Sequence, residues 1–256
     1  MPVDEVAPAV RGLRRAGSQL ALAAAFLTIL PVRLRRADVT LGGAAAWFPV
    51  VGVLIGALAG GVRVGAEPLV GSPAATVLAM IALVVVTGAL HQDGLADTAD
   101  GLGVRGDPDR RLQVMRDPAT GVFGTLALVG WALLLLTALE PLSARDAFAA
   151  LVAAVALARW AGLVHAAFTP AARPDGLGAG FHVTNAALIV ASVCAVVAAG
   201  IACGLLPGLA VVGVALAVAI LSAAGARRLI GGRTGDTIGA TVAVVEVAVC
   251  LTLLAL

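Results

Sequence analysis

Long apolar runs separated by short polar segments dominate the chain. The runs cover roughly residues 18–31, 41–61, 73–91, 121–139, 146–168, 183–204, 206–225 and 237–255. A membrane-spanning helix needs about 20 predominantly apolar residues, and every run except the first comes close to that length. The pattern therefore predicts an all-α fold, a polytopic transmembrane helical bundle of about seven spans, in one integral membrane domain over residues 1–256.

The first run is shorter than the others and ends at Pro31. Arginines stand on both sides of it, at Arg11, Arg14, Arg15, Arg33, Arg35 and Arg36. A full crossing would leave one of these clusters outside, whereas Arg and Lys collect on the cytoplasmic side of membrane proteins. We therefore expect an N-terminal interfacial or re-entrant helix. A signal peptide is the alternative, because Ala23–Ala25 follow a basic start.

Composition supports the membrane interpretation and excludes other classes. The chain is 61% hydrophobic and 12% charged, whereas soluble domains carry roughly 25% charged residues. The net charge is only +2 and no basic cluster is interleaved with aromatic residues, so we expect no nucleic-acid partner. The cysteines Cys194, Cys203 and Cys250 lie in apolar stretches without metal-ligand spacing, which favours buried, unpaired thiols.

The loops between the runs differ in their arginine content. The loops 92–120, 169–182 and 226–236 hold Arg105, Arg110, Arg111, Arg116, Arg173, Arg227, Arg228 and Arg233. The intervening connections hold only Arg63 and Arg145. Alternation of the spans places the three arginine-rich loops on one side, which the positive-inside rule identifies as the cytoplasm.

The densest polar segment is His91–Gly101, directly after the third run. If it is helical, Asp93, Asp97 and Asp100 stand at i, i+4 and i+7 and share one face. Carboxylates so close together repel one another unless a positive charge lies among them, and hard cations such as Mg²⁺ take oxygen ligands of this kind. We therefore predict a metal site here; the alternative is a solvated acidic loop.

The residues that follow carry weaker signals. Residues 101–106 match G-x-G-x-x-G, but a dinucleotide fingerprint must follow a β-strand, so we expect a chance match. Asp117 is either a further metal ligand or a helix cap before the next span. Arg110, Arg111 and Arg116 could neutralise substrate phosphates or could simply anchor the loop at the membrane surface.

The other two arginine-rich loops offer groups for an anion. Arg173 stands in a Pro- and Gly-rich turn. The segment Gly231–Ala240 is glycine-rich, contains Arg233 and Asp236, and opens a helix whose backbone N–H groups could receive an anion. It lacks the lysine of a P-loop.

Two charged residues, Arg159 and Glu246, lie inside predicted spans, where an ionisable group is costly and is a functional candidate. Each stands ten residues from the cytoplasmic end of its span, so both reach the same depth and we predict that they pair. The alternative is a protonated Glu246 facing another helix. His91, His165 and His182 stand at span ends and are expected to be interface residues rather than ligands.

Together these segments resemble the cobalamin synthase (adenosylcobinamide-GDP ribazoletransferase) family over nearly the whole chain. The matching segments are Phe26–Val32, Trp47–Gly52, His91–Gly101, Met115–Gly124, Arg173–Gly178 and Gly231–Ala240. The match of His91–Gly101 is the most specific. The family usually has an arginine before the leucine of the first segment. It also has a carboxylate at position 243, where this chain has Ala243, which puts any role of that carboxylate in doubt.

The resemblance implies a phosphoryl transfer at the bacterial cytoplasmic (inner) membrane, with the active face toward the cytoplasm. The 3′-hydroxyl of α-ribazole, or of its 5′-phosphate, attacks the phosphorus attached to the cobinamide of adenosylcobinamide-GDP. GMP leaves, and adenosylcobalamin or its 5′-phosphate forms. The implied cofactor is Mg²⁺. The sequence leaves the oligomeric state open.

These expectations assign roles to individual residues. Metal binding and catalysis fall to Asp93, Asp97 and Asp100, one of which accepts the proton of the attacking hydroxyl, with Asp100 as the first choice. Substrate contacts are expected from His91, Arg116, Asp117, Arg173, Arg233, Asp236, Arg159 and Glu246.

Two alternatives remain. A CDP-alcohol phosphotransferase acting in phospholipid synthesis would need an aspartate where this chain has Leu90. A small-molecule transporter would need interrupted spans with polar residues near the midplane, whereas here the polar residues collect in loops on one face.

Overall fold

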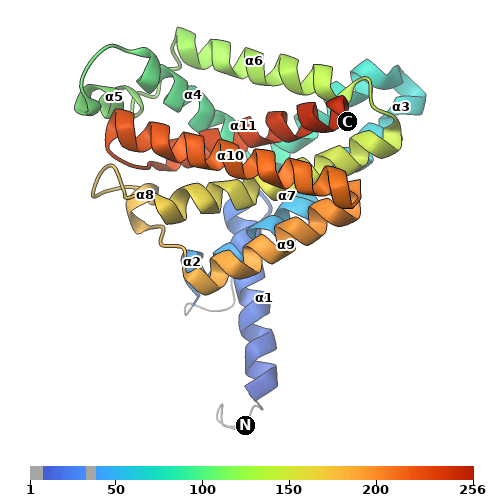
Figure 1. Ribbon diagram of the computed structural model, residues 1–256, viewed down its shortest axis with the longest axis horizontal. Coiled ribbons are helices and arrows are strands. Elements are labelled where there is room, and N and C mark those ends of the chain that lie inside the picture. The colour runs from blue at the N-terminus through green and yellow to red at the C-terminus, as the bar shows by residue number, and fades with distance from the viewer. Residues whose placement is uncertain (1–7, 33–38) are drawn as a thin grey trace.

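The computed structural model describes residues 8–32 and 39–256 (Figure 1). Its helices are α1 (Pro8–Leu27), α2 (Leu41–Ala44), the 3₁₀ helix η2 (Ala45–Trp47), α3 (Phe48–Thr87), α4 (Leu90–Gly103), α5 (Pro108–Val114), α6 (Val122–Leu139), α7 (Ala144–Phe168), α8 (Leu177–Gly180), α9 (Asn185–Cys203), α10 (Leu205–Ile230) and α11 (Gly235–Ala255). No β-strand occurs in these two ranges, apart from one isolated bridge between Ala171 and Arg233. The all-α prediction is confirmed.

Six helices are long and apolar enough to cross a membrane, among the residues described: the continuous stretch Leu41–Thr87, α6, α7, α9, α10 and α11. The first of these is bent at Gly71, whose φ of 78° and ψ of 166° are not helical. It therefore has two arms, which correspond to the separate runs predicted at 41–61 and 73–91. Six helices, one of them with two arms, account for about seven predicted spans.

The two arms of α3 run in opposite directions. At the start of the helix Phe48 stacks on Phe26, and near its end the carbonyl of Val86 accepts a hydrogen bond of 2.9 Å from the Ile29 amide. Both ends of α3 therefore lie beside the end of α1. Figure 1 shows α3 turning back at the far end of the bundle, where Arg63 donates a 2.6 Å hydrogen bond to Ser72 across the bend.

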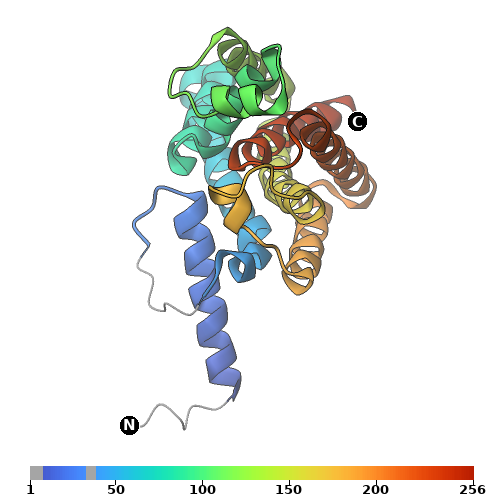
Figure 2. The same cartoon turned by 90° about the vertical axis from the view of Figure 1, so that its left-hand side faces the viewer.

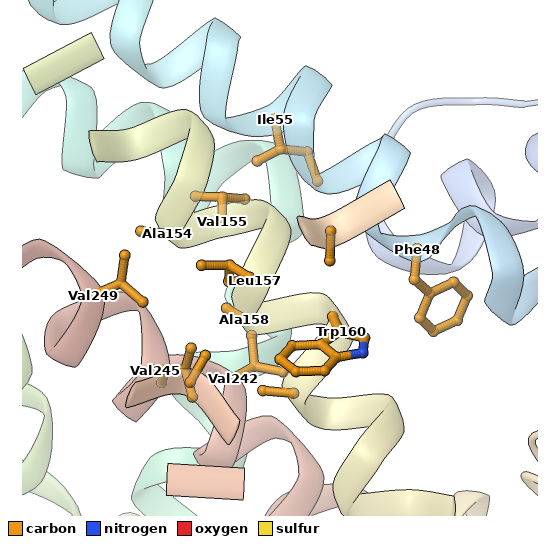
Figure 3. Close-up of a cluster of buried hydrophobic side chains, with 14 of the residues drawn as sticks. Phe48, Ile55, Ala154, Val155, Leu157, Ala158, Trp160, Val242, Val245 and Val249 are labelled. Carbon is orange, nitrogen blue, oxygen red and sulfur yellow. The ribbon is translucent and has the colours of Figure 1, made fainter. Parts of the chain in front are cut away.

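Helix α7 is the centre of the bundle, because other helices enclose it on all sides. Its side chains from Ala150 to Ala166 are buried without exception, and Figure 3 shows α7 between Ile55 of α3 and Val245 of α11. The first arm of α3 packs against α7 through Gly52, Gly56 and Gly60; a Cβ atom at Gly56 would lie 2.8 Å from the Cα of Val152. Small residues thus allow close backbone approach, as the glycine spacing indicated.

The outer helices expose apolar side chains that a soluble protein would bury. On α9 the exposed residues include Ile189, Val193 and Ile201, and on α10 they include Leu209 and Ile220. Their inner faces are lined by small residues instead, for example the buried stripe of alanines on α10. Exposed apolar surface on this scale fits contact with lipid. The protein is a multi-pass membrane protein.

Helix α1 stands apart from the bundle. Figures 1 and 2 show it projecting outward, with only its C-terminal end against the other helices. It begins and ends earlier than the run predicted at 18–31, and it is not among the six candidate spans. This arrangement supports an interfacial helix. The second flanking cluster, Arg33, Arg35 and Arg36, lies outside the described residues.

The three cysteines are unpaired, as predicted. Only Cys250 is buried inside the protein, however, whereas Cys194 and Cys203 are half-buried. The prediction of three buried thiols was wrong for these two, because their apolar surroundings on α9 extend to the outer surface of the bundle.

Candidate functional site

Helix α4 carries the acidic motif, and two left-handed residues set its direction. Gly88 and Ala89 have φ values of 60° and 58°, which end α3 and turn the chain into α4. Gly94 then packs against the first turn of α11, where a Cβ atom would lie 2.8 Å from the carbonyl oxygen of Asp236. The motif is therefore helical, as its spacing predicted, and α4 meets α11 at Asp236.

Four carboxylates from two separate motifs lie near one another at this contact. Burial raises the pKa of Asp97 from 3.8 to about 6. The negative charges of Asp93, Asp236 and Asp100 act in the same direction. Asp93 is exposed, and Asp97 and Asp236 are half-buried. The contribution of Asp236 could not be read from the spacing on α4, because it arrives from a helix that begins more than a hundred residues later.

Asp100 has a structural partner that the sequence analysis did not foresee. Its carboxylate accepts the backbone N–H of Gly121 at 2.7 Å and that of Gly124 at 2.9 Å. These amides belong to the first turn of α6, where N–H groups lack helical partners and the helix dipole favours a negative charge. Asp100 therefore anchors the start of α6, and this contact does not favour it as the residue that accepts a proton.

Asp117 does not cap α6, so that interpretation was wrong. Its side chain accepts a 3.0 Å hydrogen bond from Ala119 inside the preceding turn. The N-cap residue of α6 is Gly121, and the stabilising carboxylate is supplied by Asp100 from a neighbouring helix. A cap from a distant residue leaves no local sequence signal.

The carboxylates suit a metal that shares its coordination with a substrate. Within the described ranges, no three or more His, Cys, Asp or Glu side chains are grouped closely enough to enclose a metal ion by themselves. Mg²⁺ does not require this, because it usually keeps one or two carboxylates and completes its shell with water and substrate phosphates. Asp93 and Asp236, which line the same cavity, are two carboxylates of this kind.

The three arginine-rich loops converge at one end of the bundle, as predicted. Arg116 forms a 2.7 Å ion pair with Asp175, which joins the loop 92–120 to the loop 169–182. Arg173 lies 3.6 Å from Asp236, which joins the loop 169–182 to the start of α11. The first pair is exposed and adds little stability. The second brings a guanidinium to the edge of the acidic cluster.

Arg233 lies at the same end but is engaged by the protein backbone. Its guanidinium donates hydrogen bonds to the carbonyl of Thr169 and, at 2.9 Å, to that of Phe181. The side chain is buried. We expected a phosphate contact, whereas the geometry shows a residue that holds two loops together.

Arg159 and Glu246 form an ion pair inside the bundle, which confirms the predicted pairing. Both side chains are 1% exposed, so the pair joins α7 to α11 away from lipid. Nδ1 of His91 lies 3.4 Å from the Arg159 guanidinium and adds α4 to this connection. His165 is also buried, with Nδ1 2.7 Å from the Thr241 hydroxyl. The interpretation of these two histidines as interface residues was wrong, because both face the interior; His182 is exposed.

A cavity of about 160 Å³ adjoins the acidic cluster. Its polar lining comes from His91, Asp93, Arg159 and Asp236, and the remainder is apolar. One wall holds three phenylalanines from separate parts of the chain: Phe48 lies between Phe26 and Phe181, with ring centroids 5.6 Å and 5.9 Å apart. No local pattern in the sequence connects these rings, so the cavity could not be predicted from it.

Comparison with known proteins gives the same assignment as the motifs. The profile of the cobalamin-5-phosphate synthase family matches residues 19–254. An adenosylcobinamide-GDP ribazoletransferase from Desulforamulus reducens is 34% identical over 90% of this chain and 93% of its own length. Those from Azorhizobium caulinodans and Stutzerimonas stutzeri are 41% and 40% identical, over 78% and 90% of this chain and 79% and 95% of their own lengths. No solved structure gives a significant match. The chain belongs to the cobalamin-5-phosphate synthase family of transferases.

Proposed function

We propose that the protein transfers adenosylcobinamide phosphate from adenosylcobinamide-GDP to the 3′-hydroxyl of α-ribazole, or of its 5′-phosphate. The products are adenosylcobalamin, or its 5′-phosphate, and GMP. Family membership and the names of the relatives support the donor substrate. The observation that carries the chemistry is the cluster of Asp93, Asp97 and Asp236, where two distant motifs meet beside a cavity.

Phosphoryl transfer depends mainly on positioning and on neutralising negative charge. Mg²⁺ held by Asp93 and Asp236, which both line the cavity, would supply that neutralisation at the diphosphate. Arg173 stands within 3.6 Å of Asp236 and is placed to contact a phosphate at the edge of the cluster. Arg116 lies farther out, paired with Asp175 on the exposed surface.

Asp97 is the best placed group to accept the proton. A carboxylate with a pKa of about 6 binds a proton near neutral pH more readily than an ordinary aspartate does. The hydroxyl oxygen forms a bond to the phosphorus, the bond from phosphorus to the GMP oxygen breaks, and the proton passes to Asp97. This assignment replaces our first choice, Asp100, whose oxygens hold the start of α6.

We place the site on the cytoplasmic face of the bacterial inner membrane. The support is the convergence of the arginine-rich loops on the end that carries the acidic cluster, because loops rich in arginine stay on the cytoplasmic side. A nucleotide-linked donor made in the cytosol would reach the site without crossing the bilayer.

The test uses the full-length protein purified into lipid nanodiscs. With Mg²⁺, adenosylcobinamide-GDP and α-ribazole, the wild type should release GMP and form a cobalamin in equal amounts, measured by liquid chromatography. Asp97→Asn should reduce turnover by about a hundredfold or more, as loss of a general base does. The exposed Asp109→Asn, on α5, is the matched control.

Two results would overturn the proposal. One is no GMP release by folded wild-type protein under these conditions. The other is release of CMP from CDP-diacylglycerol and an alcohol acceptor, which would identify a CDP-alcohol phosphotransferase.

A further inference from the structure

The acidic cluster has two unlike sides. Asp93 and Asp236 line the partly open cavity, whereas Asp97 lies outside that lining. At the edge of the cluster Arg173 lies 3.6 Å from Asp236, and two residues farther along the same loop Asp175 forms the exposed ion pair with Arg116. Two substrates that react at this cluster can therefore approach from different directions, one through the largely apolar cavity and the other along the charged surface of the loops.

The lining of the cavity suits a small, apolar, aromatic ring. Phe26, Phe48 and Phe181 form one wall with nearly parallel rings, at interplanar angles of 17° and 11°. Opposite elements contribute Leu163 of α7 and Val242 of α11. A cavity of about 160 Å³ with such a lining favours a flat aromatic group over a large, amide-bearing corrin.

Arg159 lines the cavity and carries one buried donor without a partner. The residue is 2% exposed, and its Nε–H makes no hydrogen bond with any described residue, although both terminal nitrogens of this guanidinium are engaged. An unpaired buried donor is costly, so a ligand with a single acceptor nitrogen would be favoured here.

We propose that this cavity binds the base of the acceptor nucleoside. The base of α-ribazole is a methylated benzimidazole, which is flat, apolar and carries one acceptor nitrogen and no donor. With that nitrogen toward Nε of Arg159, the ribose points to Asp93 and Asp236, and its 3′-hydroxyl lies at the acidic cluster. The donor diphosphate then occupies the open side. This inference rests on the proposed function.

Val242→Phe tests the proposal by filling the cavity. Val242 is 3% exposed and lines the cavity, whereas Val244 on the same helix is 42% exposed and faces outward, so Val244→Phe is the matched control. Val242→Phe should raise the KM for α-ribazole about tenfold or more, as expected for a mismatch in an apolar pocket. The KM for adenosylcobinamide-GDP should stay within about twofold of the wild type, and Val244→Phe should change neither constant.

Val242→Ala keeps the test valid if the larger side chain prevents folding. It widens the cavity, and it should shift the preference for the acceptor toward nucleosides with a larger aromatic base. Unchanged acceptor KM and unchanged preference in the folded variants would overturn the proposal.

Equilibrium dialysis of radiolabelled α-ribazole, without donor or Mg²⁺, separates this inference from the proposed function. Wild-type binding that is lost in Val242→Phe supports the subsite even if no GMP is ever released, in which case only the function fails. Normal turnover with an unchanged acceptor KM in both Val242 variants leaves the function standing and removes the subsite. Neither binding nor turnover by folded protein would overturn both.

Discussion

The raised pKa of Asp97 predicts how the stability of the protein depends on pH. Its pKa is raised to about 6, so between about pH 4 and pH 6 the folded protein keeps a proton that the unfolded chain has lost. Protonation then favours the folded state, and stability decreases as the pH rises through this window. In Mg²⁺-free buffer we expect the wild-type Tm to fall between about pH 4 and pH 6, and Asp97→Asn to show a flatter profile. Equal slopes would contradict the raised pKa.

Arg159 and Glu246 depend on each other inside the bundle. Removing one partner leaves a buried charge without compensation, at a cost of about 3–5 kcal/mol. We expect Arg159→Met and Glu246→Leu each to lower the Tm strongly, and the double variant that carries both substitutions to regain much of the loss. A double-mutant cycle measured by thermal unfolding in nanodiscs gives the coupling. Additive effects of the two changes would show that the pair carries no coupling energy.

Contacts of single residues could be predicted where the energetic cost of a group can be read directly from the sequence. A charge inside an apolar run needs a partner, and this led to Arg159 and Glu246. Contacts such as those of Asp100 with α6 or of Arg233 with two carbonyls could not be predicted, because they require knowing which distant backbone groups lie nearby.

Asp100 should behave differently from Asp97, because it serves an element rather than the chemistry. Asp100→Ala removes both hydrogen bonds to the start of α6 and should cost about 1–2 kcal/mol, as the loss of a helix cap does. The Tm should fall together with activity, whereas Asp97→Asn should lose activity without a matching loss of stability at pH 7. Thermal unfolding beside the GMP assay separates the two. If the Asp100→Ala protein were stable but inactive, Asp100 would have a catalytic role rather than a structural one.

The contact between α3 and α7 tolerates no side chain at its glycines. A Cβ at Gly56 would meet the backbone of α7, so Gly56→Val should separate the helices and cost about 1–3 kcal/mol. Gly61, on the same helix, has open space around it, and Gly61→Val is the control. The Tm of both variants in nanodiscs checks this, and equal values would mean that the close contact does not limit stability.

The sequence predicted which helices exist better than it predicted the residues at which they begin and end. Aspartate spacing predicted helix α4, and apolar length predicted the spans. The two predicted runs 41–61 and 73–91 are the two arms of α3, but the turn between them is made at the single residue Gly71, and α1 begins ten residues before the run that predicted it. Neither could be read from hydropathy, because the break is a single left-handed glycine and the start of α1 is polar.

The membrane topology of the whole molecule can be tested by cysteine labelling from each side of the bilayer. In a variant whose three native cysteines are replaced by alanine, a cysteine at Ala119, Pro174 or Arg228 should react with a membrane-impermeant reagent only from the cytoplasm. A cysteine at Arg145, at the opposite end of α7, should react only from outside. A position in the first group that is labelled only from outside would contradict the arrangement of the loops.

The central position of α7 has a consequence for the time course of synthesis. Arg159 is made 87 residues before Glu246, its buried partner. At roughly 5–20 residues per second, the ribosome needs about 4–17 s to deliver that partner. During this interval α7 is already made while α11 is missing, and the arginine must be tolerated by lipid, water or the insertion machinery. Helix α11, made well after α7, is thus the one that completes the interior around Arg159, and a chain that stops before α11 should be an early target of membrane proteases.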